Sequence, residues 1–433
     1  MTHACTRLRR GAVTATVVAA LMAAGAGGTA CGTTATVSGP TVSGPTVSGP
    51  AAAGVPPVTV PPSPSGSATG DVRTLTPAVT GRLDAAVRRV MREADVPGVT
   101  VGLWTHGQGT YVRSFGVADR SDGREMSPDL YARIGSETKT FTVTALLKLV
   151  DEGRVGLDDP IGRYVGGVPG GDVITLRELA GMRSGLFNYT EDPDFFKALT
   201  SDPRRPFTPR QLLDYAFRHP VLSPPGREFS YCNTNLILLG LVVEKAGGMP
   251  AADYIRENVL APAGLHHTLF PSGAAFPAPH AQGYTDQTAS GAVEETAGWN
   301  PSWAWTAGAM ISDLDDLHTW ARTVATGVLP DGTTLIGPAT QKQRLATLPT
   351  TVPGAGYGLG IFDVRGWIGH NGSLPGYESL TVYLPSAQAT LVVLLNTDIS
   401  HDGAEPSTLF GEAVTEIVSP GHVFDLPAQP AAR

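Results

Sequence analysis

Ser136 and Lys139 lie three residues apart at the start of a helical pattern that continues to about residue 150. Because residues three apart on a helix share one face, the Lys139 side chain is expected beside the Ser136 hydroxyl. Val143 and Leu146 continue the apolar face below this pair, which would bury the lysine and lower its pKa toward neutrality. Free amides at the helix N-terminus favour the oxyanion that forms when a serine is acylated. The pattern therefore predicts Ser136 as the nucleophile of a serine hydrolase.

A Ser-x-x-Lys pattern alone also fits a helix cap followed by a solvated lysine. A second cluster supplies partners, because Tyr231 and Asn233 lie where a predicted loop meets a helix. Tyr231 can take the Ser136 proton if Lys139 stays cationic, and the Asn233 amide can hold Lys139 and a substrate carbonyl. The sequence leaves open which of Lys139 and Tyr231 is the base. Taken alone, Tyr231 fits a half-buried core residue.

A third cluster, His370, Asn371, Gly372 and Ser373, precedes a predicted strand pair. Gly372 is expected to let a substrate lie against the strand edge, because it has no side chain. The Ser373 amide is expected to complete an oxyanion hole with the amide of the nucleophilic serine. By itself, His370 fits a surface residue equally well.

These clusters are far apart in the sequence, so the fold must bring them together. Helical and alternating apolar spacings predict an order of elements along the chain. The predicted elements are a helix at 79–94, strands at 98–104 and 109–118, a mostly helical middle at 174–300 with its clearest helix at 233–245, strands at 357–364, 378–384 and 390–396, and a helix at 406–417. This order predicts an α+β fold (an α/β sandwich), in which an antiparallel sheet from both ends of the chain is flanked by helices and a mostly helical lobe is inserted. Active sites favour the cleft between two such lobes.

Composition limits the partners and the redox chemistry. The 433 residues are 42% hydrophobic and only 16% charged, and the net charge of -8 argues against nucleic acid as a partner. Of the three cysteines, Cys5 and Cys31 fall in a leader, which leaves Cys232 alone in the body of the chain. We therefore expect no intramolecular disulfide there.

The first 31 residues have the pattern of an export signal. Arginines precede an apolar run from Ala12 to Ala24, and small residues lead to Cys31. The run is too short for a permanent membrane helix. Small residues before a cysteine resemble a bacterial lipoprotein processing box, although Gly28 stands where leucine is usual. We favour lipid anchoring at Cys31 over plain secretion after cleavage at Ala30.

A spacer is predicted at 32–75, because a five-residue Thr-Val-Ser-Gly-Pro unit occurs three times within 36–50 and Pro, Gly, Ser and Thr dominate. Such a tether suits a domain that stands off a membrane through a cell-wall layer, and a spacer without an anchor is the alternative. The catalytic domain is predicted at 76–420, followed by a tail at 421–433.

Together, Ser136-x-x-Lys139, Tyr231-x-Asn233 and His370-x-Gly372 resemble, in this order, the motifs of the serine β-lactamase and penicillin-binding protein family. The resemblance is strongest to the branch of class C β-lactamases, actinomycete DD-carboxypeptidases and related esterases. It covers about 76–417. Further segments similar to the DD-carboxypeptidases are 174–179, 183–186, 230–235, 280–284, 306–312 and 356–360.

The resemblance implies a β-lactamase/transpeptidase-like fold and a two-step reaction without a cofactor. Ser136, deprotonated through Lys139 and Tyr231, attacks a carbonyl to form an acyl-enzyme. Tyr231 returns a proton to the leaving group, and water then releases the acyl group. It also implies that His370 tunes the proton network near Tyr231 and that Trp303 lines the cleft.

Two departures from the family pattern bear on the substrate. Asn371 stands where these enzymes usually carry a hydroxyl that helps to bind the substrate carboxylate. Residues 361–363 replace the arginines that hold the terminal carboxylate in the similar actinomycete enzymes, and Arg365 is the nearest substitute. Both changes leave room for an ester or amide without a carboxylate.

Other classes of function fit less well. His266 and His267 are adjacent and are expected to lack a cysteine or carboxylate cluster, which argues against a metal enzyme. The body of the chain lacks the Gly-x-Ser-x-Gly elbow of the α/β-hydrolases. A catalytically silent protein that binds peptidoglycan or a β-lactam is an alternative outside the enzymes. A complete set of Ser136, Lys139, Tyr231 and Asn233 argues against it.

We therefore predict an exported serine hydrolase that acts on a cell-wall peptide, an ester or a β-lactam. A D-alanyl-D-alanine carboxypeptidase-like activity is favoured, an esterase comes next and a β-lactamase third. The only membrane contact expected is a lipid anchor at Cys31.

Overall fold

The computed structural model describes residues 71–426. The predicted export signal with Cys31, most of the predicted spacer and the end of the predicted tail lie outside these residues.

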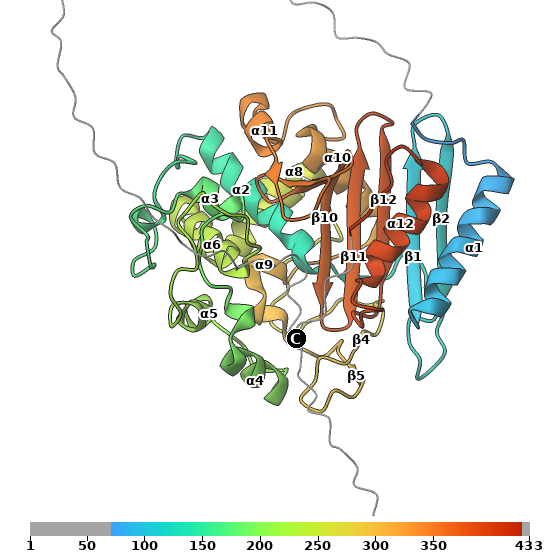
Figure 1. Cartoon of the computed structure of the whole chain (residues 1–433), viewed down its shortest axis with the longest axis horizontal. Coiled ribbons are helices and arrows are strands. Elements are labelled where there is room, and N and C mark those ends of the chain that lie inside the picture. Colours follow the sequence, from blue (N-terminus) through green and yellow to red (C-terminus); the bar gives the residue numbers. More distant parts are fainter. Residues whose placement is uncertain (1–70, 427–433) are drawn as a thin grey trace, which may run out of the picture.

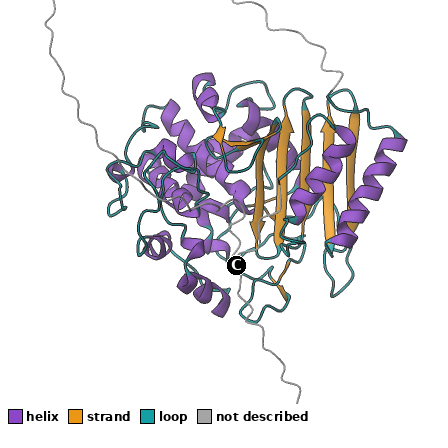
Figure 2. Ribbon diagram, in the orientation of Figure 1, coloured by secondary structure: helices purple, strands orange, loops and turns teal. Residues whose placement is uncertain are grey.

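An eight-stranded antiparallel sheet is the centre of the described domain (Figures 1 and 2). The N-terminal hairpin of β1 (Gly98–Thr105) and β2 (Gly109–Gly116) pairs with β12 (Ala389–Leu395), with Val99 opposite Leu395. The sheet continues through β11 (Tyr377–Leu384), β10 (Trp367–Leu374), β9 (Phe362–Val364), β8 (Ala355–Tyr357) and β7 (Leu348–Pro349). The prediction of a sheet built from both ends of the chain is confirmed.

Helices cover both faces of the sheet. On one face, α1 (Pro77–Glu93) and α12 (Pro406–Val418) pack side by side (Figure 1). Against the other face lies α10 (Leu314–Thr326), whose Trp320 stacks on Phe141 of α2 (Thr138–Asp151). Every residue of β11 and β12 is buried, because helices pack on both faces of the sheet at these strands.

A helical lobe lies beside the sheet, as predicted (Figure 2). Its centre is the pair α2 and α6 (Asn233–Gly247), which are buried over most of their surface. The other elements of the lobe are α3 (Leu176–Ala180), η3 (Tyr189–Glu191), α4 (Pro193–Ser201), α5 (Pro209–Ala216), α7 (Ala251–Ile255), η4 (Arg256–Leu260), α8 (Ala261–Ala263), η5 (Pro301–Trp303) and α9 (Trp305–Gly308). Farther along the chain, α11 (Pro338–Arg344) precedes the last strands.

Several predicted elements need correction. The strand predicted at 357–364 is two short strands, β8 and β9, joined by a turn at which Gly360 has a φ of 67°. Residues 265–300 are largely irregular rather than helical. The predicted order of elements has no strand between 118 and 357, and this was wrong. Two-residue strands pair earlier, β3 (Ala132–Arg133) with β6 (Ile311–Ser312) and β4 (Tyr284–Thr285) with β5 (Glu294–Glu295). Strands this short leave no alternating pattern in the sequence.

The globular unit extends beyond the predicted 76–420 on both sides. Val72 is buried, and the amide of Arg73 donates to the carbonyl of Val418. Phe424, in the predicted tail, is fully buried against Phe362. These isolated apolar residues lie among polar residues and prolines, so composition did not reveal them.

Within residues 71–426, no single helix is long and apolar enough to cross a membrane. The pair of α6 and the segment 251–263 meets the criterion only jointly, with a bend of 77° between the two parts. Cys232 is a buried free cysteine, as expected for the lone cysteine of the body.

Candidate active site

Ser136 lies in a tight turn, η1 (Gly135–Glu137), that leads directly into α2. Two glycines let this turn lie against β10. A Cβ on Gly135, whose φ is 51°, would be 2.5 Å from the Ser373 amide nitrogen. A Cβ on Gly372 would be 2.0 Å from the carbonyl oxygen of Ile134. The nucleophile turn and the strand therefore meet backbone to backbone, which larger residues would prevent.

Lys139 is fully buried beneath Ser136, as the helical spacing predicted. Its Nζ atom lies 2.8 Å from Oγ of Ser136 and donates to the carbonyl oxygen of Ala307 at 2.7 Å. Burial lowers the pKa of Lys139 well below its ordinary value, and the charge of Cys232 opposes this effect only in part. A neutral amine at this position can accept the hydroxyl proton of Ser136.

Tyr231 lies two residues before α6, and its ring centroid is 4.8 Å from Nζ of Lys139. Burial raises the pKa of Tyr231, and an interaction with the Ser136 hydroxyl opposes that rise in part. A phenol with a raised pKa stays protonated, so it can donate a proton but is a poor initial base. The sequence left Lys139 and Tyr231 open as the base, and these environments favour Lys139.

Gly372 was predicted to open a strand edge to the substrate, and this is wrong. A side chain at this position would point at the carbonyl of Ile134 and not at the cavity. Glycine is therefore needed here for the close packing of the strand against the nucleophile turn. Ser373, the next residue, does line the cavity beside Ser136. The close approach of Gly135 to the Ser373 amide keeps this backbone near the nucleophile.

Asn233 lines the cavity but does not hold Lys139. Its Nδ2 atom donates to Oγ1 of Thr190 at 3.4 Å, whereas the hydrogen bonds of the lysine go to Ser136 and Ala307. The prediction of an Asn233–Lys139 contact was wrong, because a carbonyl from α9 takes that place. Sequence spacing cannot reveal a backbone partner that far along the chain.

The cavity above Ser136 lies between the helical lobe and β10. Five of its lining residues were predicted as site residues besides Ser136, namely Tyr231, Asn233, Trp303, Asn371 and Ser373. The sequence did not predict the other lining residues as site residues, namely Tyr189, Thr190, Phe195, Phe196, Leu199, Gln287, Ala304, Ala307, Gly308, Leu374, Pro375 and Glu405. The first five belong to one segment, 189–199, whose aromatic and apolar residues were the only available signal.

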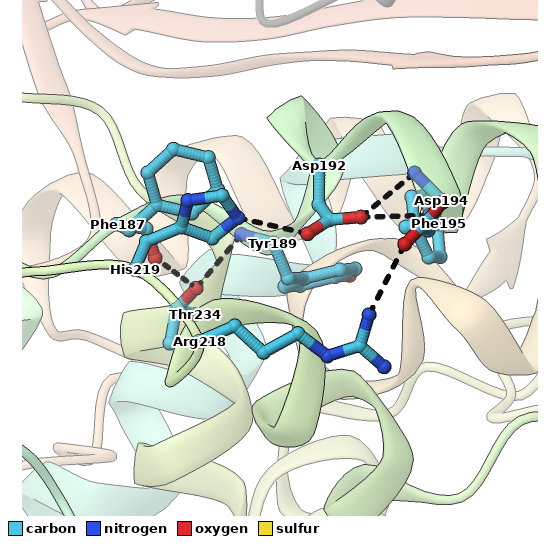
Figure 3. Close-up of polar contacts among 8 residues, drawn as sticks. All are labelled: Phe187, Tyr189, Asp192, Asp194, Phe195, Arg218, His219 and Thr234. Atoms are coloured by element: carbon cyan, nitrogen blue, oxygen red, sulfur yellow. Dashed lines mark hydrogen bonds and ion pairs between the residues drawn. The ribbon is translucent and has the colours of Figure 1, made fainter.

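A polar network holds this segment in place (Figure 3). Asp192 accepts hydrogen bonds from the amides of Asp194 and Phe195, at 2.8 Å and 3.0 Å, and contacts Nε2 of His219 at 2.8 Å. Thr234 of α6 accepts from the amide of Tyr189. The aromatic wall of the cavity is thereby fixed to the start of α6, which also carries Asn233.

His370 is buried behind Tyr231, with the two ring centroids 6.1 Å apart. Its Nδ1 atom donates to the carbonyl of Asn371 at 2.5 Å, so Nε2 can accept from the Tyr357 hydroxyl at 3.1 Å. Burial, with a smaller effect of Lys139, lowers the pKa of His370 to about 3. A neutral imidazole supports the position of Tyr231 without touching the cavity, and its role in proton transfer stays a prediction.

This geometry agrees with the comparison to known proteins. Residues 83–413 match the Beta-lactamase family. The chain belongs to this family.

The similar proteins carry several different enzyme names. A solved D-stereospecific amidohydrolase from Streptomyces sp. is 30% identical, with a TM-score of 0.67 over 78% of this chain and 97% of that chain. The D-amino acid amidase of Ochrobactrum anthropi SV3, complexed with L-phenylalanine amide, is 27% identical, with a TM-score of 0.66 over 80% and 96%. A D-aminopeptidase of Brucella anthropi is 28% identical over 72% of this chain and 59% of its own length. The chain spans between 59% and 64% of the curated relatives compared.

Arg365 does not replace the carboxylate-binding arginines of the similar family members. It is exposed in the turn after β9, where its guanidinium lies 3.9 Å from Asp425. It does not line the cavity. The substitution was inferred from sequence proximity, and the turn carries the side chain away from the site.

The expectation that no carboxylates accompany His267 was also wrong. His267, Asp313 and Asp316 lie within 4.8 Å of one another by their ligand atoms. Hydrogen bonds already engage them, because Asp313 caps α10 and contacts His267 while Asp316 accepts from Thr268. The cluster ties the segment at 267–268 to α10.

Proposed function

We propose that this protein is a serine amidohydrolase that forms an acyl-enzyme at Ser136 and releases amines from small amides of amino acids. The observation that carries the proposal is the buried Lys139, whose Nζ lies 2.8 Å from the Ser136 oxygen at the floor of an aromatic-lined cavity. Family membership supports serine hydrolase chemistry.

The proposed reaction has two balanced steps. Oγ of Ser136 bonds to the amide carbon while its proton passes to Lys139, and the amides of Ser136 and Ser373 stabilise the oxyanion. The carbon–nitrogen bond then breaks, and Tyr231 gives its proton to the leaving amine while it regains one from Lys139. In the second step water bonds to the acyl carbon and gives its proton to Lys139. The bond between that carbon and Oγ of Ser136 then breaks, the proton returns through Lys139 and Tyr231 to Oγ, and the acid and free Ser136 are released.

The lining of the cavity supports an amide without a free carboxylate. Among its described residues there is no lysine or arginine that could pair with a carboxylate, and Glu405 would repel one. Three relatives are named a D-stereospecific amidohydrolase, a D-amino acid amidase and a D-aminopeptidase. We therefore place D-amino acid amides first and the DD-carboxypeptidase favoured by the motifs second.

Esterase and β-lactamase activities require the same acylation and differ in leaving group and deacylation rate. A silent binding protein would keep the cavity without turnover. The buried, hydrogen-bonded lysine supports turnover, because the desolvation of a lysine in a site without chemistry brings no gain.

One parallel assay separates these possibilities. The full chain is incubated with D-phenylalanine amide, a D-Ala-D-Ala peptide, p-nitrophenyl acetate and penicillin, and product release and intact mass are followed with time. We expect release of ammonia from the first substrate and an acyl adduct that Ser136→Ala abolishes. Equal turnover by wild type and Ser136→Ala would overturn the proposal. Cleavage of the peptide alone would favour the carboxypeptidase, and rapid loss of a penicillin adduct would favour the β-lactamase.

We also propose export and lipid anchoring at Cys31, supported by the residue pattern of the first 31 residues. The test is fractionation of cells that produce the full chain. Wild type is expected in the membrane fraction, and Cys31→Ala is expected to leave it. Retention of both proteins in the cytoplasm would contradict the proposal.

A further inference from the structure

Glu405 is the only Asp or Glu among the described residues that line the cavity. It precedes α12, yet its side chain does not cap that helix. The amide of Ser407 instead donates to Oε2 of Glu378 at 2.8 Å. The carboxylate of Glu405 is therefore not required for the start of α12.

Within residues 71–426, Glu405 has no positively charged partner. Its Oε2 accepts from Nδ2 of Asn371 at 2.6 Å. Its Oε1 atom is shielded from solvent and has no hydrogen-bond partner among the described residues. A buried carboxylate oxygen without a partner is costly, unless a ligand supplies the missing donor.

The surroundings of Glu405 are also acidic. Burial raises its pKa to about 7, and the charge of Asp398 adds to that rise. The pKa of Glu378 is raised in turn by burial and by the charge of Glu405. The charge of Glu405 also contributes to the raised pKa of Tyr231, which places this carboxylate near the catalytic centre. A substrate cation beside Glu405 would favour the ionised form of this carboxyl and supply its missing partner.

We propose that Glu405, held by Asn371, is the subsite for the free α-ammonium group of the substrate. This inference depends on the proposed amidohydrolase function. The ammonium group and the scissile carbonyl are attached to the same carbon, so Glu405 and Ser136 would each hold one substituent. The side chain would occupy the apolar wall formed by Phe195, Phe196 and Trp303. Three separate contacts around one carbon distinguish the D- from the L-enantiomer of an amino acid.

The test compares two substrates that differ in the amine. The p-nitroanilide of D-phenylalanine carries the ammonium group, and hydrocinnamoyl p-nitroanilide lacks it but is otherwise the same. We expect wild type to prefer the amine by roughly tenfold to a hundredfold in kcat/KM, the range for one charge-assisted hydrogen bond. Glu405→Gln should bring this ratio close to one. The matched control Glu294→Gln removes an exposed carboxylate of β5 and should keep the wild-type ratio.

A second measurement needs no variant. Phenethylamine should protect wild-type Ser136 from acylation by p-nitrophenyl acetate, whereas hydrocinnamate should not. Stronger protection by the carboxylate, or an unchanged amine preference in a folded Glu405→Gln, would overturn the subsite. If instead Ser136→Ala hydrolyses p-nitrophenyl acetate as fast as wild type, the hydrolase function itself fails. The two failures are therefore distinguishable.

Discussion

At the scale of single residues, the burial of Lys139 determines the chemistry. A lysine in water is protonated at neutral pH and cannot accept a proton from serine. Here the side chain is fully buried, and its hydrogen-bond partners are a hydroxyl and a carbonyl rather than a carboxylate. Nothing in this set stabilises the ammonium form by full charge, so the neutral base is available without a separate activating group.

The pH dependence of acylation follows from this environment. Because the reactive form is the neutral amine and burial lowers the pKa of Lys139, the acylation rate should reach its plateau well below pH 10.5, the ordinary pKa of lysine. Lys139→Arg should lower the rate by roughly a hundredfold to ten-thousandfold, since arginine stays charged. The burst of p-nitrophenol from p-nitrophenyl acetate measures the pH profile of wild type and the acylation rate of Lys139→Arg.

The control is Lys148→Arg on the same helix, where Nζ of Lys148 donates to the carbonyl of Leu335. This variant should acylate like wild type. A wild-type rate that keeps climbing up to pH 10.5 would show that Lys139 is cationic at rest and that another group is the base.

Residue types alone were enough to predict the Ser136–Lys139 pair, because helical spacing fixes neighbours three apart. They were not enough for contacts across the fold. Asn233 was assigned to Lys139, but the lysine binds a backbone carbonyl that any residue type would provide. Glu405 was missed because a lone glutamate before a helix has no distinguishing pattern.

At the scale of elements, the site depends on how closely η1 approaches β10. Gly135 and Gly372 remove the two side chains that would separate them, and Ser379 of β11 donates to the carbonyl of Ile134 at 3.0 Å. The nucleophile is thereby fixed to the sheet, while Tyr231 and Asn233 come from the helical lobe. The cavity forms between the sheet, which holds the nucleophile turn, and the helical lobe, which supplies Tyr231 and Asn233.

Gly372→Ala tests this contact. The added Cβ would lie 2.0 Å from the Ile134 carbonyl oxygen, so the turn must move away from the strand. We expect a loss of about 1–3 kcal/mol in the free energy of unfolding and an acylation rate lower by roughly a hundredfold. Urea unfolding and the p-nitrophenol burst give the two values.

Gly81→Ala serves as the control for the same chemical change. Gly81 lies within α1 with no atom within 4 Å of the added Cβ, so this variant should be more stable by about 0.5–1 kcal/mol with unchanged acylation. If Gly372→Ala behaves like Gly81→Ala, the backbone contact is not what positions Ser136.

The long elements were predictable because each has a clear period. The hairpin of β1 and β2, the strands β11 and β12, and the helix α12 all lie within a few residues of their predicted bounds. The sequence did not predict the irregular segment at 265–300 or the paired two-residue strands. Their hydrogen bonds join parts of the chain that are distant in the sequence.

At the scale of the whole molecule, an acidic protein buries several carboxylates around its site. Burial raises the pKa of Glu137 to about 8 and that of Asp398 to about 7, while it lowers the pKa of His370 to about 3. These effects have opposite consequences for stability. The histidine destabilises the fold as pH falls below its unfolded value near 6.5, because it must charge on unfolding. The carboxylates destabilise it as pH rises.

Glu137→Gln isolates one of the carboxylates. In the native state Glu137 stays protonated up to about pH 8, whereas in the unfolded chain it ionises near 4.5. Its contribution to stability is therefore complete below pH 4.5 and is lost as pH rises toward 8. The glutamine variant cannot ionise and has nearly the same size and shape as the protonated glutamate. The free energy of unfolding of wild type should thus fall with rising pH more steeply than that of the variant, with a difference on the order of a few kcal/mol.

Urea unfolding at a series of pH values measures both slopes, with Glu294→Gln as the exposed control. Parallel slopes for wild type and Glu137→Gln would mean that the carboxyl is solvated or paired in the folded protein, contrary to its burial behind the nucleophile.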